Sequence, residues 1–202
     1  MLVAHGSSDR RFLSTVESIA AGVRALRPSV DVRVGLLDHG PPHVADIAGA
    51  VAVPLFLSSG YHVRVDLPAQ APGAQVASPV GPDPLLCDAL ADRLAEAGYD
   101  GAAPVALAAA GSADKQSLDD VRRQAEMLAA RLGVEVTAAF LSAGEPRLSD
   151  VKPDVVASYL LAPGVFHDKL ASSGAKVISA PIGDHNVVAD VVLDRYDSAL
   201  SS

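Results

Sequence analysis

Residues 54–62 read Pro-Leu-Phe-Leu-Ser-Ser-Gly-Tyr-His, an apolar run followed by small turn residues, an aromatic side chain and a histidine. Residues 159–167, Tyr-Leu-Leu-Ala-Pro-Gly-Val-Phe-His, repeat this order 105 positions later, the shift from His62 to His167. Self-similarity at a fixed spacing indicates a duplicated structural unit, so the chain is predicted to consist of two related halves. Shifts of 102 to 105 residues relate further segments in the same order: Gly6-Ser7 with Gly111-Ser112, Asp9 with Asp114, Leu37, Gly40 and Pro42 with Leu141, Gly144 and Pro146, and Pro79-Val-Gly81 with Pro181-Ile-Gly183.

The repeat also predicts the domain organisation. A chain of 202 residues suits one large domain or two small ones, and the duplication selects two. We expect an N-terminal domain over residues 1–100 and a degenerate C-terminal copy over residues 101–202. The stretch 99–104, Tyr-Asp-Gly-Ala-Ala-Pro, contains the turn-forming residues typical of a linker between them.

Both halves alternate strand and helix patterns. Continuous apolar runs without polar alternation are typical of strands buried on both faces of a parallel sheet. Residues 12–26 and 118–132 place apolar side chains at steps of three and four, the pattern of a one-faced helix. The predicted fold is therefore α/β: two similar small domains, each a parallel sheet flanked by helices, related by a pseudo-two-fold axis with a cleft between them. The predicted strands span residues 2–4, 32–37, 51–57 and 75–77 in the first half, and 105–109, 134–141, 155–161 and 175–179 in the second.

Charge and composition exclude several classes of partner. Sixteen basic against 24 acidic side chains give a net charge of −8, which argues against nucleic acid and against an anionic membrane surface. The apolar runs are far shorter than the roughly 20 residues of a membrane span, and the first residues lack the pattern of a signal peptide. The single cysteine, Cys87, is expected to be a small core residue and cannot form an internal disulfide. We therefore expect a cytoplasmic protein.

Polar side chains gather at the predicted strand ends of the first half only. His5 ends the first strand, Asp38-His39 ends the second, and the segment 58–62 follows the third. The matching positions of the second half are Ala110, Ser142-Ala143 and His167. Ligands bind beyond the carboxyl ends of parallel strands, so chemistry is expected in the first half. Neutral imidazole is a common ligand of divalent transition metals and can accept a proton near neutral pH, whereas His39, His43 and His185 are expected to be solvated loop residues.

Other kinds of site lack their sequence patterns. There is no Cys/His cluster with the spacing of a structural zinc site, and His5-Gly-Ser-Ser is not a phosphate-binding glycine loop. Ser7 has no G-x-S-x-G elbow, which argues against a serine hydrolase.

These residues carry a resemblance to a known family. Val3-Ala-His-Gly-Ser7, the stretch 53–66 with its Ser-Ser-Gly-Tyr-His-Val-Arg-Val-Asp sequence, and the weaker echo at residues 161–168 resemble the sirohydrochlorin chelatases. These enzymes belong to the class II chelatase superfamily, and the match is to its long, internally duplicated form. The resemblance implies insertion of Co²⁺ or Fe²⁺, and sometimes Ni²⁺, into a carboxylate-rich tetrapyrrole without ATP, in cobalamin or sirohaem biosynthesis. The divalent metal is then a substrate, and no permanently bound cofactor is expected.

The resemblance also implies residue roles. His5 and His62 match the family's active-site histidines and are expected to be both catalytic and metal-binding. Asp38 falls at or near a family glutamate, shorter by one methylene, and is the third expected metal ligand. We expect the tetrapyrrole to contact residues at the strand ends: Ser7, Arg10, Ser58, Ser59, Gly60, Tyr61, Arg64 and His167.

Two alternatives remain open from the sequence. The chain could be a non-catalytic tetrapyrrole or metal carrier, or a ferrochelatase acting on a porphyrin. Few aromatic residues for stacking on an apolar ring argue against the second alternative. Because both halves lie in one chain, a monomer is expected to suffice.

Overall fold

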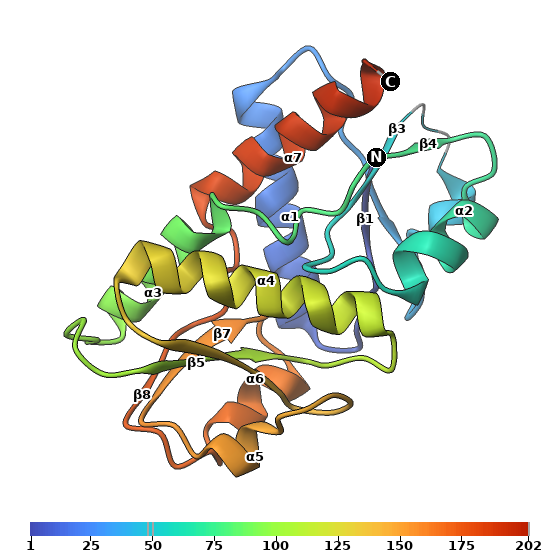
Figure 1. Ribbon diagram of the computed structural model, residues 1–202. Helices are drawn as coiled ribbons and strands as arrows, with labels where there is room; N and C mark the ends of the chain where they lie inside the picture. Colours follow the sequence, from blue (N-terminus) through green and yellow to red (C-terminus); the bar gives the residue numbers. More distant parts are fainter. Residues whose placement is uncertain (48, 50, 202) are drawn as a thin grey trace. The chain divides into compact units, whose positions relative to one another are not determined.

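Two four-stranded parallel sheets form the framework of the computed structural model, which describes residues 1–47, 49 and 51–201 (Figure 1). The first sheet has the order β2-β1-β3-β4, and the second repeats it as β6-β5-β7-β8. All strand pairs are parallel, and the central strand of the first sheet pairs Leu2 with both Val34 and Val53. The predicted α/β class with two flanked parallel sheets is confirmed. The strands are β1 (Leu2–Ala4), β2 (Val34–Leu36), β3 (Val51–Pro54), β4 (Gln75–Val76), β5 (Val105–Ala109), β6 (Val136–Phe140), β7 (Val155–Tyr159) and β8 (Val177–Ile178).

Burial explains why these short runs are strands. Every residue of β1, β2, β3, β5 and β7 is buried, as expected for strands covered on both faces. Most are shorter than predicted, because the apolar residues after the last ladder position continue into loops. The outermost strands β4 and β8 have two residues each and are only partly buried.

The two long helices α1 (Arg10–Leu26) and α4 (Lys115–Leu132) begin at equivalent aspartates. The carboxylate of Asp9 accepts a hydrogen bond from the Arg11 backbone N–H at 2.9 Å, and Asp114 accepts one from Gln116 at the same distance. Such N-caps satisfy backbone donors that a helix leaves open at its first turn. The other helical segments are η1 (Val44–Asp46), the π-helical turn η2 (His62–Asp66), α2 (Leu67–Gln70), α3 (Leu86–Glu96), α5 (Leu148–Val151), α6 (Val165–Leu170) and α7 (Asn186–Leu200).

The compact units do not follow the predicted boundary between residues 100 and 101. One unit comprises Met1–Gly81 with Asp184–Ser202, and the other comprises Pro82–Gly183. Helix α3, which follows the first sheet in sequence, packs against α4 and β7 of the second unit. Helix α7, at the end of the chain, packs against α1 and β3 of the first unit.

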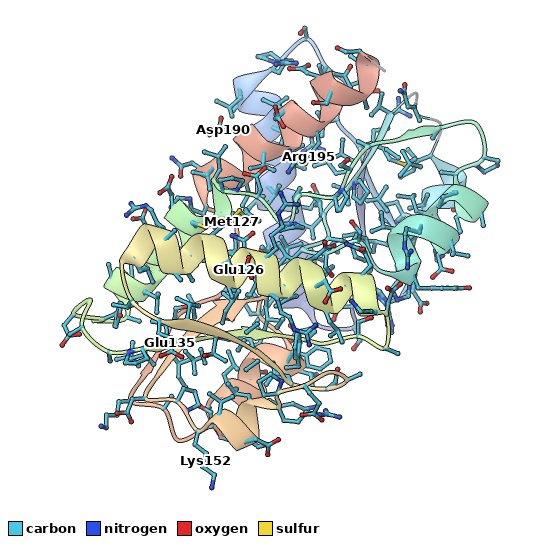
Figure 2. The ribbon with its side chains drawn as sticks, viewed as in Figure 1. Glu126, Met127, Glu135, Lys152, Asp190 and Arg195 are labelled. Atoms are coloured by element: carbon cyan, nitrogen blue, oxygen red, sulfur yellow. The ribbon has the colours of Figure 1, made fainter. Side chains whose placement is uncertain are left out.

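The repeated Pro-Val-Gly and Pro-Ile-Gly segments mark the points of exchange. Gly81 donates a backbone hydrogen bond to Phe56 at 3.0 Å, and Gly183 donates one to Leu161 at 2.9 Å. The chain therefore stays on its own sheet up to these glycines, and the following helix joins the other unit. In the first unit, Arg195 on α7, labelled in Figure 2, anchors the returning helix. Its Nε donates to the Pro79 carbonyl at 2.9 Å.

A buried polar group holds α3 in the second unit. Gln124 on α4 is fully buried, and its amide oxygen accepts a 2.9 Å hydrogen bond from the Asp83 backbone. Its amide nitrogen donates to the Asp83 carbonyl and to the Cys87 Sγ on α3, both at 3.1 Å. The buried Tyr159 hydroxyl donates to the same amide oxygen at 3.3 Å. None of the helices within the described residues is long and apolar enough to cross a membrane.

Candidate metal centre

The carboxyl ends of β1, β2 and β3 meet at one edge of the first sheet, because β1 lies between the other two. His5 follows β1, Asp38 and His39 follow β2, and His62 begins the π-helical turn η2 after β3. The Asp38 backbone N–H donates to the His5 carbonyl at 2.9 Å, which holds the first two loops together. The topology thus brings the predicted polar residues of the first half to one place.

The two predicted catalytic histidines are adjacent. The rings of His5 and His62 lie edge to face, with centroids 4.5 Å apart and an interplanar angle of 84°. Imidazoles that share one ion, each about 2.1 Å from it through a ring nitrogen, have centroids about 5 Å apart. The spacing of this histidine pair therefore suits a shared divalent ion.

The surroundings of His5 favour its neutral form. Burial lowers the pKa of His5 below its ordinary value of 6.5, and the neighbouring His62 lowers it further. A neutral imidazole retains the lone pair that a metal ligand or a proton acceptor requires.

Glycine is required directly after His5. Gly6 has a φ of +98°, and a Cβ at this position would lie 2.1 Å from the Asp38 carbonyl oxygen. Only glycine permits both this backbone conformation and the close approach of the two loops. The predicted substrate residue Ser7 follows, and its hydroxyl accepts a hydrogen bond from the Asp9 backbone at 3.1 Å.

A carboxylate without a predicted role contacts the His62 ring. Its Nδ1 lies 2.6 Å from Oδ2 of Asp66, four residues later at the end of η2. Phe56 stacks beside the same ring with centroids 6.2 Å apart. The spacing of four residues was the available signal, since it places both side chains on one face of a helical turn.

Asp38, the third predicted metal ligand, lies near the pair and contacts His39. Its side chain is 70% exposed, and Oδ1 accepts a 2.7 Å hydrogen bond from the His39 backbone N–H. This hydrogen bond, together with the nearby His39 imidazole, lowers the pKa of Asp38. Within residues 1–47, 49 and 51–201, no three His, Cys, Asp or Glu side chains form a group that could hold a metal ion.

His39 is closer to the site than expected of a solvated loop residue. It is exposed, but its ring centroid lies 6.0 Å from that of His5. Its φ of +61° lies in the left-handed region, which non-glycine residues rarely adopt and which is enriched at functional sites. The sequence pattern contains no signal for this backbone conformation.

The other predicted substrate residues of the first unit are close in sequence to His5 or to His62. Arg10 is exposed at the start of α1, and Arg64 is exposed within η2. Tyr61 is 57% exposed, and its ring lies edge to face against His62 with centroids 6.1 Å apart. Ser58, Ser59 and Gly60 form the half-buried turn that leads from β3 to η2.

His167, predicted to contact substrate, lies in the second unit on α6. Its Nδ1 is 3.1 Å from the Oγ of Ser158, a fully buried residue of β7. The position equivalent to His5 is Ala110, so this unit has no corresponding histidine pair.

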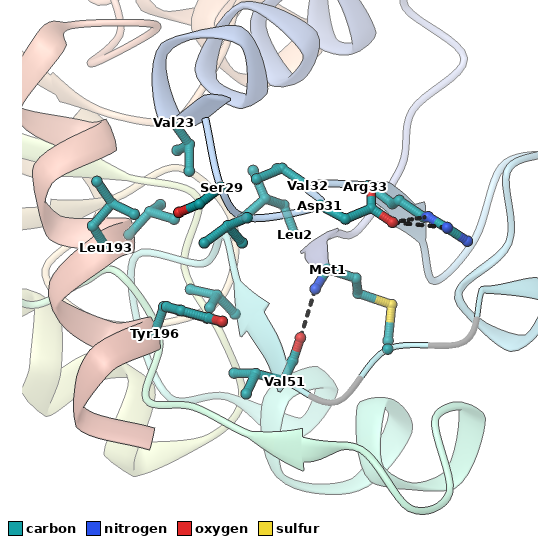
Figure 3. A pocket seen from close by; sticks show the side chains of 14 residues that line it. Met1, Leu2, Val23, Ser29, Asp31, Val32, Arg33, Val51, Leu193 and Tyr196 are labelled. Carbon is teal, nitrogen blue, oxygen red and sulfur yellow. Dashed lines mark hydrogen bonds and ion pairs between the residues drawn. The ribbon is translucent and has the colours of Figure 1, made fainter. Parts of the chain in front are cut away.

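A cavity of about 360 Å³ lies at the opposite end of the first sheet, where β1 and β3 begin (Figure 3). Val23 of α1, Val51 at the start of β3, and Leu193 and Tyr196 of α7 contribute to its wall. None of the predicted site residues lines this cavity.

Comparisons with known proteins bear on the family and the fold. Residues 1–97 match the family model CbiX. No curated protein sequence gives a significant match. The resemblance to the chelatases inferred from the sequence is confirmed by this match over residues 1–97.

Solved structures that share this fold include three chelatase-related proteins. SirB from Bacillus subtilis with Fe³⁺ matches with a TM-score of 0.80 and 23% identity, covering 98% of this chain and 93% of that one. The sirohydrochlorin chelatase SirB from Bacillus subtilis subspecies spizizenii, in complex with cobalt, gives a TM-score of 0.76 at 21% identity over 99% of this chain and 94% of that one. CbiX, the terminal enzyme for biosynthesis of siroheme in denitrifying bacteria, gives a TM-score of 0.75 at 24% identity. The match covers 98% of this chain and 97% of that one. The chelatase fold therefore extends over nearly the whole chain.

Proposed function

We propose that this chain is a sirohydrochlorin chelatase, which inserts a divalent metal ion into sirohydrochlorin and releases two protons. The observation that carries the proposal is the edge-to-face pair of His5 and His62 at the carboxyl edge of a chelatase-fold sheet. The solved relatives with bound Fe³⁺ or cobalt support the same metal chemistry, with Co²⁺ or Fe²⁺ as the substrate ion here.

Metal insertion requires a site that holds the ion and then lets it go. The ion exchanges its water ligands for the histidine pair, and afterwards exchanges the imidazoles for four ring nitrogens of the tetrapyrrole. Two of these nitrogens lose their protons as the metal binds, so the metallated ring gains no net charge. A closed site with four protein ligands would trap the ion, whereas two imidazoles leave coordination positions open.

His5 also suits the role of proton acceptor. Because burial and His62 hold its pKa low, His5 is neutral when the metal arrives and can coordinate it. Once the ion has moved to the ring, the same lone pair is available for a pyrrole proton. We propose that protons leave the site through these imidazoles, without any requirement for ATP.

The surroundings suit a flat, polyanionic substrate despite the net charge of −8. Arg10 and Arg64 are exposed on the segments next to the histidine pair and can meet substrate carboxylates. The exposed ring of Tyr61 offers an apolar face beside His62. Local potential rather than net charge steers a ligand to its site.

Incubation of the purified protein with sirohydrochlorin and Co²⁺ tests the proposal. We expect many equivalents of metallated product per protein molecule. The change in the visible spectrum of the tetrapyrrole measures this product. A single equivalent that stays bound would instead show a carrier. A preference for a more apolar porphyrin with Fe²⁺ would show a ferrochelatase.

We also propose that the chain acts as a monomer in the cytoplasm. We propose in addition that the predicted halves, residues 1–100 and 101–202, are the two copies of an ancestral duplication. For the monomer proposal, light scattering at micromolar concentration is expected to give the mass of one chain, 20.6 kDa. A dimer that persists on dilution would contradict the monomer proposal.

A further inference from the structure

We propose that Asp66 is a positioning residue that fixes the tautomer and orientation of His62, so that Nε2 of the imidazole is presented to the metal ion. The proposal rests on the proposed function only for its effect on metal insertion. The hydrogen bond of 2.6 Å between His62 Nδ1 and Asp66 Oδ2 is its starting point.

A carboxylate at this distance determines where the ring proton lies. Ionised Asp66 can only accept, so Nδ1 of His62 must be the donor and carry the hydrogen. In the neutral ring the lone pair is then on Nε2. Metal-bound histidines commonly donate their other ring nitrogen to a carboxylate, which sets the tautomer and raises the basicity of the ligating nitrogen.

The backbone of this segment favours such a role over a structural one. Asp66 occupies the N-cap position of α2, where aspartate usually bonds to the first backbone N–H groups of the helix. Its side chain makes no capping hydrogen bond. The Leu67 N–H instead reaches the His62 carbonyl in the π-helical turn, and the carboxylate of Asp66 contacts the His62 ring. Single π-helical turns are frequent at functional sites.

The second unit provides an internal comparison. The shift of 105 residues that relates His62 to His167 relates Asp66 to Ala171. Lacking this carboxylate, His167 directs its Nδ1 to the Ser158 hydroxyl, at 3.1 Å. A hydroxyl both donates and accepts, so it selects neither tautomer. The carboxylate is thus present in the copy that has the histidine pair and absent from the copy that lacks it.

Stability is a weak explanation for the contact. The side chains of His62 and Asp66 are 45% and 28% exposed, and ion pairs at exposed sites contribute little to folding. Removal of the carboxylate is therefore expected to change the histidine more than the fold.

The test uses Asp66→Ala and Asp66→Asn in the full chain, with Asp46→Asn as the matched control. Asp46 is an exposed carboxylate of the same unit, in η1, and its neutralisation changes the net charge by the same amount. The first measurement is the tautomer of His62 from ¹⁵N chemical shifts at pH 8 without metal. We expect the Nδ1–H form in the wild type and in Asp46→Asn, and a mixture of tautomers in Asp66→Ala.

The second measurement is the affinity for Co²⁺ alone, from its visible absorption on binding. Loss of a carboxylate behind a ligating histidine commonly weakens metal binding 10- to 100-fold, so we expect at least about a tenfold loss in Asp66→Ala. Asp66→Asn should fall between this variant and the wild type, because the amide oxygen still accepts from Nδ1–H but has no charge. This isosteric variant keeps the test valid if the alanine variant folds poorly.

Two results would overturn the proposal: an Nε2–H tautomer in the wild type, or unchanged tautomer and Co²⁺ affinity in Asp66→Ala. Both measurements are made without sirohydrochlorin. Failure of the wild type to metallate sirohydrochlorin would contradict the proposed function but would leave these two measurements unaffected.

Discussion

His5 and His62 face each other edge to face across two neighbouring strands of one parallel sheet, with ring centroids 4.5 Å apart. His5 directly follows β1, and His62 begins the turn η2, which follows β3. Since β1 pairs directly with β3, the strands determine the separation of the two loops. The pair is therefore positioned by the most regular part of the first unit, and removal of either ring leaves that framework in place.

We expect His5→Ala and His62→Ala to lower metal insertion into sirohydrochlorin by about 100-fold or more, because a positioned proton acceptor or ligand typically contributes 10²- to 10⁴-fold. Both variants should retain wild-type circular dichroism, since loop side chains contribute little to the core. His167→Ala, the equivalent change in the second unit, is expected to retain substantial activity. Unchanged turnover in His5→Ala would contradict the assignment of the pair.

The pH dependence of His5 follows from its surroundings. Burial and His62 lower its pKa, so the unfolded chain binds this proton at a higher pH than the folded protein. Stability is therefore expected to fall as the pH drops below about 6.5, until the folded-state pKa of His5 is passed. In His62→Ala, the pKa of His5 should move upward towards 6.5, measured by NMR titration of the imidazole. A downward movement would show that His62 does not repel the charged ring.

Gly6 and Gly111 provide a matched pair of substitutions. Each has positive φ, and an added Cβ would lie 2.1 Å from the carbonyl oxygen of Asp38 or of Ala143. We expect alanine at either position to destabilise its own unit, by about 1–3 kcal/mol from the backbone strain alone. Only Gly6→Ala should also weaken Co²⁺ binding, because only its loop carries a histidine of the pair. Equal losses of Co²⁺ affinity in both variants would indicate a general effect of unfolding.

The sequence was sufficient to predict the two sheets and the histidine pair. Buried parallel strands leave continuous apolar runs, and their carboxyl ends lie together whatever the loops contain. The exchange of α3 and α7 could not be predicted, because an apolar helix face fits either sheet equally well. The burial of Gln124 could not be predicted from the apolar pattern of α4, because glutamine is polar. It nevertheless lies on the buried face between Val121 and Ala125.

The finer parts of the site were also beyond the sequence. Asp66 is part of the quoted motif, but a carboxylate on a helical turn has the same pattern when it only contacts solvent. The position of His39 depends on a left-handed backbone at a non-glycine residue, for which sequence contains no reliable signal.

Cys87 is expected to be unreactive in the folded protein. Burial raises the pKa of its thiol from 9.0 to about 11, so almost no thiolate is present at pH 8. A thiol reagent should therefore label the chain slowly without denaturant and rapidly in urea, as followed by mass spectrometry. Since the unfolded chain loses this proton first, stability should also decrease as the pH rises from about 9 to 11. Complete labelling of native protein within minutes would contradict this expectation.

The buried amide of Gln124 allows the polar contacts inside the second unit to be measured. Alanine here removes one partner from Tyr159, from Cys87 and from both backbone groups of Asp83, and leaves a cavity beside α3. Lost buried hydrogen bonds and a cavity together should lower the free energy of unfolding by about 2–4 kcal/mol in urea denaturation. Glu126→Ala, at an exposed position on the same helix (Figure 2), should change it by less than about 0.5 kcal/mol. A loss below about 1 kcal/mol in Gln124→Ala would show that packing of apolar side chains, rather than this amide, holds α3 in the second unit.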